Sequence, residues 1–575
     1  MARKIQVKRG LAANIPLLDM GEFAITTDTE KPFIGSTSGN VELAKQTILD
    51  AYKAENATVV NVLSEGVKGD GTDETILTQA AFDKAINNHG VFYIPSGVTV
   101  VVDQLKVTGK SNFKIVIDGT LKRKANASSF EKSGIGDVWG LLRIVQCTDF
   151  DIQTFHGDGN IAENPSSEGV DVNETQHIIH LSECDRVRLG TIVGINPGGD
   201  VLLIGYCYDI LCDSLYGYGN YVGRQTLSIY DGERMQFGNI MSIGIGMRLM
   251  PGGIDLEPEA NPWGDAPRII KDIEFGNVYI DSMADGCFIV SNNFTEVTET
   301  NLSPATISNI TVNNLICKRP YTISDGRGRV GVWLKHCDNI KIKGVIYEDH
   351  VGTVEEPISS TGLYIEGCNN LYLDLDIQNV FIGFKVGYFA VTNQLKLSGR
   401  IKDIAGHGFA IKDLTDSVIE SQIEDCGKLG GDYWCGYFDY GGTLTKDVYF
   451  KNASFVRKTY GNVGINFTGA NLRNVWFENC DFRGWDSTYI PFRNSGDFIA
   501  RGSVVHRIGC KNINYASAMP TTSYWQAGEY VENTVPTIVG TAGSKYVVKG
   551  WKRITSNANN VLNTDWVEDR ALTGS

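Results

Sequence analysis

Asn339-Ile-Lys-Ile is one copy of the short phrase that decides the fold: a polar residue, an apolar residue, any residue and a second apolar residue. The phrase returns at intervals of roughly 22 to 38 residues, the range typical of solenoids. Its other copies are Asn112-Phe-Lys-Ile, Asp149-Phe-Asp-Ile, Arg186-Val-Arg-Leu, Asp209-Ile-Leu-Cys, Arg234-Met-Gln-Phe, Asp272-Ile-Glu-Phe, Asn309-Ile-Thr-Val, Asn370-Leu-Tyr-Leu, Gln394-Leu-Lys-Leu, Ser417-Val-Ile-Glu, Asp447-Val-Tyr-Phe, Asn474-Val-Trp-Phe and Asn512-Ile-Asn-Tyr. The alternation buries one face of each strand, and the regular return stacks each strand on the copy before it. The pattern therefore predicts an all-β chain folded as a parallel β-helix.

Charge and hydropathy exclude some classes of partner. The chain has 575 residues and a net charge of −15, which argues against nucleic acid, because nucleic-acid binding relies on Lys and Arg. No stretch approaches 18 uninterrupted apolar residues, and Met1-Ala-Arg-Lys-Ile-Gln-Val-Lys lacks the apolar core of a signal peptide. We expect no membrane partner and a protein made in the cytoplasm.

The 12 cysteines are spread over the chain without a Cys-x-x-Cys pair, so we expect buried thiols and neither disulfides nor a metal site. Six of them stand at the approach to a repeat phrase, as small corner residues would: Cys147, Cys184, Cys207, Cys337, Cys368 and Cys510. No phosphate-binding glycine loop, His-Glu-x-x-His or Gly-x-Ser-x-Gly phrase is present. The sequence therefore predicts no cofactor.

One helix is expected at the N-terminal end of the solenoid, where the first coil would otherwise expose apolar interior and an unpaired strand edge. Residues 78–88 fit this role, because Ala81, Phe82, Ala85 and Ile86 fall on one stripe. We predict a capping helix there.

The flanks of this helix carry a resemblance to a known group of proteins. Val67-Lys-Gly-Asp-Gly-Thr-Asp-Glu-Thr and Val91-Phe-Tyr-Ile-Pro-Ser-Gly resemble the opening of the pectate-lyase-like superfamily, which includes polygalacturonases and phage tailspikes. The resemblance implies a right-handed parallel β-helix. It does not specify the reaction, since the superfamily holds hydrolases, lyases, epimerases and plain binders.

Both ends of the chain narrow the choice by resemblance. Arg3-Lys-Ile-Gln-Val-Lys-Arg-Gly and Gly21-Glu-Phe-Ala-Ile-Thr-Thr-Asp-Thr are similar to the heads of preneck appendages from short-tailed Bacillus phages. Ala518-Met-Pro-Thr-Thr, Gly528-Glu-Tyr-Val and Gly550-Trp-Lys-Arg-Ile resemble the small β module that closes such spikes. The resemblance implies a tailspike located in the virion and assembled as a homotrimer. Its partners would be tail or neck proteins of the virion.

These resemblances divide the chain into three expected domains. Residues 1–55 form a virion-attachment head, residues 56–515 the β-helix with receptor binding and catalysis, and residues 516–575 a small C-terminal β module. Asp569-Arg-Ala-Leu-Thr-Gly-Ser resembles the junction at which some spikes release a C-terminal trimerisation chaperone. A mature cleavage product and an ordinary stop codon both remain open.

Polar residues about one coil apart should form a ladder, because coils stack about 4.8 Å apart. Asp200 is followed one coil later by Arg224-Gln225, then by Asp255 and Glu257, then by Asp285. Asp255 and Glu257 are two residues apart, so both side chains leave the same face of a strand. Glycoside hydrolysis needs such a pair of carboxyl groups, one as the acid and one as the base or nucleophile.

Gly252-Gly-Ile-Asp-Leu-Glu-Pro resembles a phrase of many phage and bacterial β-helix enzymes, in which Gly-Ile-Asp-Phe-Glu-Pro follows Gly-Asp-Gly and Arg-Gln-Gly on earlier coils. Val201 and Thr226 replace the glycines expected after Asp200 and Gln225, which weakens the transfer of roles at those coils.

We interpret Asp255 and Glu257 as the catalytic pair, with Asp200 as a third carboxylate that raises one pKa by repulsion. Arg224, Gln225, Asp285, Arg327 and Arg329 are the candidate substrate-binding residues, since guanidinium groups suit an anionic polymer. Stacked Asp and Asn residues also occur as purely structural ladders in solenoids. Aromatic residues that are candidates to stack on sugar rings, although several should fill the core, are Trp333, Tyr364, Trp434, Tyr437, Trp476 and Trp485.

Three functions remain open. The first is a depolymerase that hydrolyses a host glycopolymer, either wall teichoic acid or capsular polysaccharide. The second is a receptor-binding fibre without catalysis. The third is a polysaccharide lyase, which is disfavoured because Asp255 and Glu257 form the clearest polar pair, whereas the candidate histidine bases share no phrase: His156, His177, His180 and His407.

Overall fold

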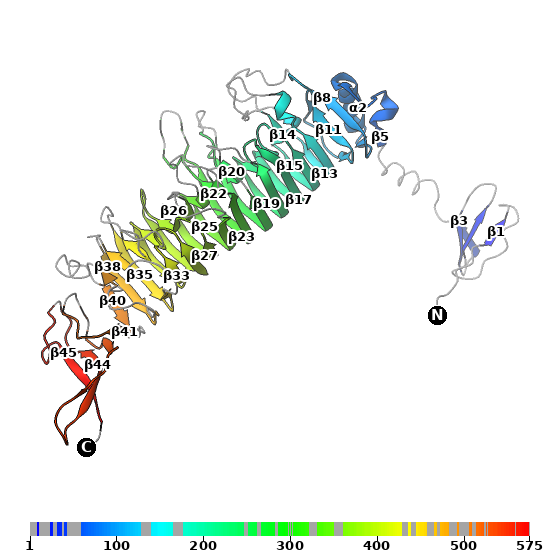
Figure 1. The fold of residues 1–575 in the computed structure, drawn as a ribbon. Helices are drawn as coiled ribbons and strands as arrows, with labels where there is room; N and C mark the ends of the chain where they lie inside the picture. The colour runs from blue at the N-terminus through cyan, green and yellow to red at the C-terminus, as the bar shows by residue number, and fades with distance from the viewer. Residues whose placement is uncertain are drawn as a thin grey trace.

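The computed structural model forms a long solenoid of parallel strands (Figure 1). The structure describes residues 8–10, 23–26, 32–36, 39–42, 59–127, 140–164, 176–245, 251–260, 266–281, 286–296, 298, 301, 303–320, 330–349, 360–427, 435–438, 444–456, 465–467, 472–481, 492–493, 505–508, 513–521, 525, 527–557 and 559–573. The right-handed parallel β-helix predicted from the sequence is confirmed.

Two long sheets build the solenoid. One is 14-stranded, with β9 (Leu105–Thr108), β12 (Gly140–Val145), β14 (His177–Ser182), β16 (Leu202–Gly205), β18 (Leu227–Ile229), β20 (Pro251–Leu256), β22 (Gly286–Ser291), β24 (Val330–Lys335), β26 (Thr361–Glu366), β28 (Ile382–Val386), β31 (Phe409–Ile411), β34 (Gly436–Phe438), β37 (Ile465–Phe467) and β39 (Phe492–Arg493). The other is 22-stranded, with β5 (Val59–Asn61), β6 (Asp70–Asp73), β7 (Val91–Ile94), β8 (Thr99–Val102), β10 (Lys114–Ile117), β11 (Thr120–Arg123), β13 (Thr148–Asp158), β15 (Asp185–Ile195), β17 (Cys207–Val222), β19 (Gly232–Ile245), β21 (Ile269–Asp281), β23 (Thr306–Pro320), β25 (Asp338–Asp349), β27 (Asn369–Gln378), β29 (Thr392–Ser398), β30 (Arg400–Ile404), β32 (Leu414–Ile419), β33 (Gln422–Cys426), β35 (Thr445–Lys451), β36 (Ser454–Val456), β38 (Leu472–Glu478) and β40 (Val505–Ile508).

The coil has three sides, because the long strands bend. The first half of β13 pairs with β10, and its second half pairs with β11. The same division returns further along, where β27 pairs with β29 and then with β30. Two sides of each coil are therefore joined into the 22-stranded sheet, and the third side belongs to the 14-stranded sheet.

In twelve of the repeat phrases the opening polar residue has a left-handed backbone, with φ between 52° and 58°, whereas Asn512 of the last phrase lies outside the described residues. This holds for Asn112, Asp149, Arg186, Asp209, Arg234, Asp272, Asn309, Asn339, Asn370, Gln394, Asp447 and Asn474. Asn and Asp adopt this conformation more readily than most other residues, which explains why the phrase favours them. In the phrase at Ser417 the left-handed residue is Asp416, one position earlier than predicted. The Ser417 hydroxyl is buried and accepts a hydrogen bond from the Leu395 amide at 3.0 Å.

Stacked coils also join these turn residues to one another. The Asn309 amide donates to Asp272 at 2.7 Å, and the Asn339 amide donates to Asn309 at 2.8 Å. Where arginine takes the left-handed position, its guanidinium binds the aspartate of the coil before, as Arg234 binds Asp209 at 2.7 Å. The turn side chains of neighbouring coils thus supply hydrogen-bond partners for one another.

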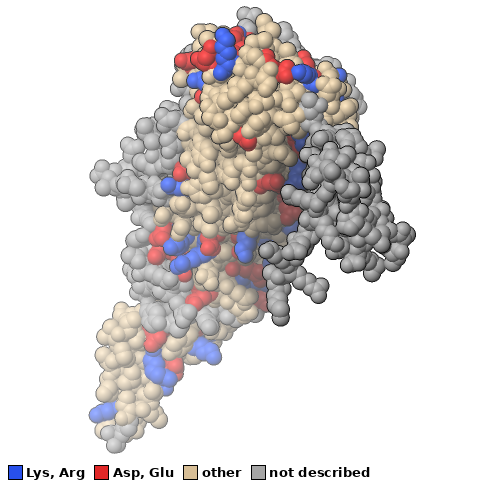
Figure 2. All heavy atoms as spheres, turned by 90° about the vertical axis from the view of Figure 1, so that its right-hand side faces the viewer, with Lys and Arg blue, Asp and Glu red and all other residues tan. Residues whose placement is uncertain are grey.

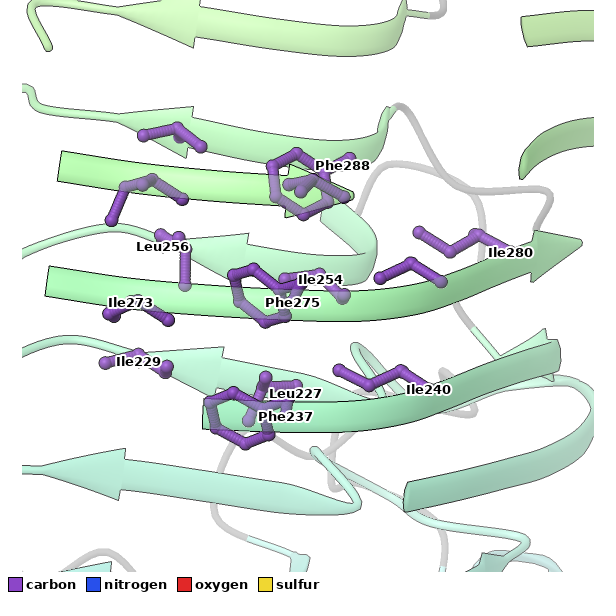
Figure 3. Packing of buried hydrophobic residues seen from close by; sticks show 14 of the residues in the cluster. Leu227, Ile229, Phe237, Ile240, Ile254, Leu256, Ile273, Phe275, Ile280 and Phe288 are labelled. Atoms are coloured by element: carbon purple, nitrogen blue, oxygen red, sulfur yellow. The ribbon is translucent and has the colours of Figure 1, made fainter. Parts of the chain in front are cut away.

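Apolar side chains from the sheets meet inside the solenoid (Figure 3). Leu227, Ile254 and Leu256 of the 14-stranded sheet pack toward Phe237 and Phe275 of the other sheet. The eleven cysteines that the structure describes are all buried, as predicted. Buried apolar residues of neighbouring coils are paired in register, as Cys212, Phe237 and Phe275 are, so the interior is a set of apolar columns along the axis.

The N-terminal end is closed by α2 (Thr75–Asn87), which begins three residues before the predicted helix. The four predicted residues of its apolar stripe are buried, and Phe82 meets Phe92 edge to face at 5.0 Å. The buried Glu74 carboxylate accepts the amides of Lys68 and Gly69 at 2.5 and 2.9 Å. The preceding loop is thereby fixed to the start of the helix, and the predicted cap is confirmed.

Two further sheets lie outside the solenoid. In the N-terminal segment, β1 (Lys8–Gly10), β2 (Phe23–Thr26), β3 (Pro32–Ser36) and β4 (Gly39–Glu42) form a four-stranded sheet. Near the C-terminus, a five-stranded sheet consists of β41 (Ile513–Ala516), β42 (Tyr530–Asn533), β43 (Ile538–Val539), β44 (Tyr546–Arg553) and β45 (Trp566–Leu572). Its own small core includes Trp525, Trp551 and Trp566. The predicted boundaries of the head and of the C-terminal module remain predictions.

The surface carries acidic and basic side chains intermixed. On the face drawn in Figure 2, blue and red atoms lie close together, and the described residues form no single large basic area there. No helix in the described part of the chain is long and apolar enough to cross a membrane.

Candidate active site

The end of β20 places the two predicted catalytic carboxylates on the outer side of the sheet: Asp255 lies in the strand, and Glu257 directly follows its last residue. Ile254 and Leu256 point into the core (Figure 3), so the alternate residues Asp255 and Glu257 leave on the opposite face. Asp255 is 2% exposed, whereas Glu257 is half-buried. Their Cα atoms are roughly 6.6 Å apart, because a strand rises about 3.3 Å per residue. The pair therefore consists of one carboxyl group shielded from water and one that water reaches.

Three coils bring polar side chains into one column beside this pair. His177, Asp200 and Gln225 each stand two residues before a register-paired apolar residue of β14, β16 and β18. All three are almost fully buried. The backbone N–H of Gln225 donates a hydrogen bond to Asp200 Oδ1 at 3.3 Å. The column is thus held both by the sheet and by its own side chains.

His177 and Asp200 form the tightest part of the column. Nδ1 of His177 lies 3.0 Å from the Asp200 amide nitrogen and 3.1 Å from Asp200 Oδ2. The amide can only donate, so it requires Nδ1 as an acceptor, whereas the carboxylate requires a proton on Nδ1. Either protonation state keeps the imidazole against Asp200, which makes His177 a positioning residue for that carboxylate.

Gln225 connects the column to the catalytic pair. Its side-chain Nε2 donates to Asp255 Oδ2 at 3.1 Å. Asp255 is paired in register with Ser228, three residues beyond Gln225. The ladder expected from the sequence is therefore oblique, and the long Gln225 side chain spans the offset. Oδ1 of Asp255 is buried without a hydrogen-bond partner among the described residues.

Burial separates the chemistry of the two carboxyl groups. The pKa of Asp255 is raised well above its ordinary value, first by burial and then by the nearby negative charge of Glu257. Burial also raises the pKa of Glu257, but the hydrogen bond from Asn293 and the charge of Arg224 oppose this shift. Asp255 thus favours the protonated form more strongly, and Glu257 is the better candidate for the ionised form.

Two residues that the sequence analysis missed support Glu257. The Asn293 amide donates to Glu257 Oε1, and Lys335 Nζ donates to Asn293 Oδ1 at 2.7 Å. Lys335 lies in the same register column as Glu257, two coils further on. Neither residue belongs to a sequence phrase, so only the stacking of coils reveals them. His177 was detectable in principle, because His177-Ile-Ile takes the coil position of Asp200-Val-Leu and Gln225-Thr-Leu.

The remaining predicted residues divide into two groups. Arg224 is half-buried near both catalytic carboxyl groups, and its charge favours their ionised forms. Asp285, Arg327 and Arg329 lie outside the described residues. The structure thus brings together Asp200, Arg224, Gln225, Asp255 and Glu257.

No protein-family model matches the chain, and no curated protein sequence matches it. Among solved structures, it is similar to an exopolygalacturonase from Thermotoga maritima, at 11% identity and a TM-score of 0.34, over 76% of this chain and 96% of that one. It is similar to the A-module of a mannuronan C-5 epimerase from Azotobacter vinelandii, at 13% identity and a TM-score of 0.42, over 80% and 99% of the two chains. It is also similar to tailspike protein 3 of bacteriophage CBA120, at 11% identity and a TM-score of 0.36, over 93% and 82% of the two chains. All three likenesses concern the fold.

Proposed function

We propose that the chain is a phage tailspike that binds a host cell-surface glycopolymer and cleaves it by hydrolysis at Asp255 and Glu257. The observation that carries the proposal is the difference in environment between these two side chains at the end of β20. Asp255 is buried and bound to Gln225, whereas Glu257 is half-buried beside Asn293. A protonated and an ionised carboxyl group on one face are what glycoside hydrolysis requires.

Asp255 acts as the general acid. Its Oδ2 accepts a hydrogen bond from Gln225, which leaves Oδ1 to carry the proton. That proton passes to the oxygen of the scissile bond as the bond breaks. The negative charge of Asp200 and the burial of Asp255 keep the proton in place until then.

Glu257 acts as the general base. It removes a proton from a water molecule, which attacks the carbon from the side opposite the leaving oxygen. Glu257 suits this role because its side chain is half-buried, so that water can reach the carboxylate.

Arg224 extends the proposal to an anionic polymer. Its guanidinium lies near both catalytic carboxyl groups and offers hydrogen bonds to a phosphate or carboxylate of the substrate. Wall teichoic acid and anionic capsular polysaccharide both carry such groups, and they remain the two candidate substrates of the virion-borne spike.

A lyase is the second candidate, and one observation favours it. Nδ1 of His177 lies 3.1 Å from Asp200 Oδ2, and a histidine held in place by a carboxylate is a candidate for the base that abstracts a proton. His177 and Asp255 are both buried, at 1% and 2% exposed, but the carboxyl pair also has the half-buried Glu257, which water can reach. We therefore rank hydrolysis first.

Fragment release tests the function directly. The wild-type protein is expected to convert purified host wall polymer or capsule into soluble fragments with new reducing or phosphomonoester ends. Fragments that absorb at ~235 nm, as an unsaturated uronic acid does, would identify a lyase that acts beside a carboxylate. Binding without any fragments would identify a receptor-binding fibre and reject the hydrolase.

We also propose that three chains associate through the outer face of the 22-stranded sheet. Leu211, Tyr218 and Ile243 are large apolar residues that are 41%, 36% and 36% exposed. Tyr218 and Ile243 are paired in register on β17 and β19, so they form a continuous apolar area. Association of this face would remove that area from water.

The double substitution Tyr218→Lys and Ile243→Lys is therefore expected to convert the assembly to monomers, because charged side chains would be buried at the contact. Molar mass by light scattering after gel filtration measures this. Leu77→Lys, at an exposed residue of α2, is the matched control and should leave the assembly intact. A trimer that survives the double substitution places the contact elsewhere.

A further inference from the structure

The outer face of the 14-stranded sheet continues beyond the catalytic pair as a column of aromatic and cationic side chains. Asp255 is followed in register by Ile289, Trp333, Tyr364 and Lys385 on successive coils. Side chains paired in register on a parallel sheet point to the same face. With coils about 4.8 Å apart, Lys385 lies about 19 Å along the axis from Asp255.

The aromatic rings of this face lie next to one another or beneath lysines. Trp333 and Tyr364 have ring centroids 5.8 Å apart. Lys385 Nζ lies 3.9 Å from the centroid of Tyr388 and 5.5 Å from that of Tyr364, and Lys412 Nζ lies 5.7 Å from Tyr388. The Tyr364 hydroxyl donates to the buried Glu366 at 3.0 Å, which fixes the orientation of its ring. We call Trp333, Tyr364, Lys385, Tyr388 and Lys412 the lysine–aromatic track.

The column then continues toward the C-terminal coils. Ala410 and Tyr437 follow Lys385 in register, and the Tyr437 ring stacks on His407 at 5.1 Å. Trp333, Lys385 and Tyr437 are partly exposed, whereas Tyr364 is only 9% exposed. Flat rings beside cations on an accessible surface suit a chain of sugars that carries negative charge, because the rings contact the apolar faces of sugars and the ammonium groups attract the charge.

Charge explains why such a track is needed. The whole chain has a net charge of −15, and the catalytic pair adds local negative charge. An anionic polymer is therefore repelled by most of the molecule unless cations compensate. Lys335, bound to Asn293 beside Glu257, continues this compensation from the catalytic pair to the track.

We propose that the lysine–aromatic track binds an anionic glycan chain that runs along the solenoid axis from the catalytic pair toward the C-terminal coils. The direction of the bound glycan rests on the proposed function, since the glycan must reach Asp255 and Glu257 to be cleaved. The expected ligand is a polyanion built of sugar or polyol units, whose charges are either carboxylates or phosphodiesters.

Binding is measured with the full-length protein carrying Asp255→Asn, so that the probe is not degraded. The probes are polygalacturonate, poly(glycerol phosphate) and carboxyl-reduced polygalacturonate as the neutral counterpart. At low salt, Lys385→Gln with Lys412→Gln is expected to weaken binding of an anionic probe about tenfold, and the difference should shrink as salt rises. Tyr388→Ala should weaken binding without changing the salt dependence.

Lys341→Gln and Tyr372→Ala are the matched controls. Lys341 Nζ lies 6.0 Å from the Tyr372 ring centroid, but on the 22-stranded sheet, so both controls should bind as the parent does. Preference for one anionic probe identifies carboxylate or phosphate as the charge. The proposal is overturned if neither anionic probe binds, if the neutral probe binds as tightly, or if the double lysine variant binds unchanged. Cleavage of host polymer by the otherwise wild-type protein is scored separately, so failure of catalysis is distinguishable from failure of the track.

Discussion

Asp255→Asn is expected to lower the rate of polymer cleavage by about 10²- to 10⁴-fold, the range that a general acid contributes. Asparagine keeps an oxygen that accepts the hydrogen bond from Gln225, but it has no proton to give to the leaving oxygen. Polymer binding should therefore be retained while kcat falls. Initial rates of end-group release over a range of polymer concentrations separate the two quantities.

The dependence of kcat/KM on pH provides an independent check. The acid must be protonated, so activity is lost as the pH rises through the raised pKa of Asp255. The base must be ionised, so activity is lost as the pH falls through the pKa of Glu257, which is also above its ordinary value. Glu257→Gln should remove the acidic limb of the profile. An unchanged profile in that variant would remove Glu257 from the mechanism.

Asp255→Asn should also make the folded protein more stable. Because the folded pKa of Asp255 is raised, the unfolded chain loses this proton at lower pH than the folded chain does. Stability therefore falls as the pH rises from the ordinary pKa to the raised one, and asparagine avoids this loss. Asp255→Asn is expected to raise Tm at pH 7, whereas a purely structural role for Asp255 predicts a lower Tm.

Asp565→Asn in the C-terminal module is the matched control, because the opposite change in Tm is expected there. The hydrogen bond from Thr555 holds the pKa of Asp565 below its ordinary value. Ionised Asp565 therefore contributes stability that is present above the ordinary pKa and is lost as the pH falls. Its replacement should lower Tm at pH 7 and leave cleavage unchanged.

Phe275→Ala is expected to destabilise the coils beneath the catalytic pair by about 3 to 5 kcal/mol. Phe275 is fully buried, stacks on Phe237 at 5.2 Å and meets Phe288 edge to face at 5.7 Å (Figure 3). The substitution removes both ring contacts and leaves a cavity between β20 and β21. Coils of a solenoid contact only their neighbours, so the loss should be local.

Amide hydrogen exchange measures this effect coil by coil. Exchange should accelerate in the strands next to β21 and remain unchanged near α2 and in the C-terminal sheet. Phe389→Ala is the matched control, because Phe389 is 82% exposed and its ring contributes little burial. Acceleration along the whole solenoid would instead mean that the coils unfold as one cooperative unit.

The repeat phrase was enough to predict the fold because it combines two local rules. Alternation decides which side chains are buried, and a left-handed residue opens the repeat phrase, as at Asn339 and Asp447. Both rules act within a few residues, so a linear sequence displays them. The phrase at Ser417 was misplaced by one residue because Asp416 and Ser417 are both suitable turn residues, and burial of the serine decides between them.

The candidate site was only partly visible in the sequence. Asp255 and Glu257 were predictable as neighbours, because two residues of spacing on a strand settle their common face. His177 was named only as a candidate lyase base, and Asn293 and Lys335 were not predicted, since each joins the site from a different coil. Coil lengths vary with the loops, so the register between coils cannot be counted along the chain.

The sequence by itself therefore determined the β-helix, its capping helix and the paired carboxylates, because each depends on local periodicity. Only the tertiary structure decided which of the two carboxyl groups is shielded from water. It also decided that the ladder runs obliquely through Gln225 and that lysines and aromatic rings follow Asp255 in one column. These features depend on register and burial across stacked coils, which arise only when distant segments pack together.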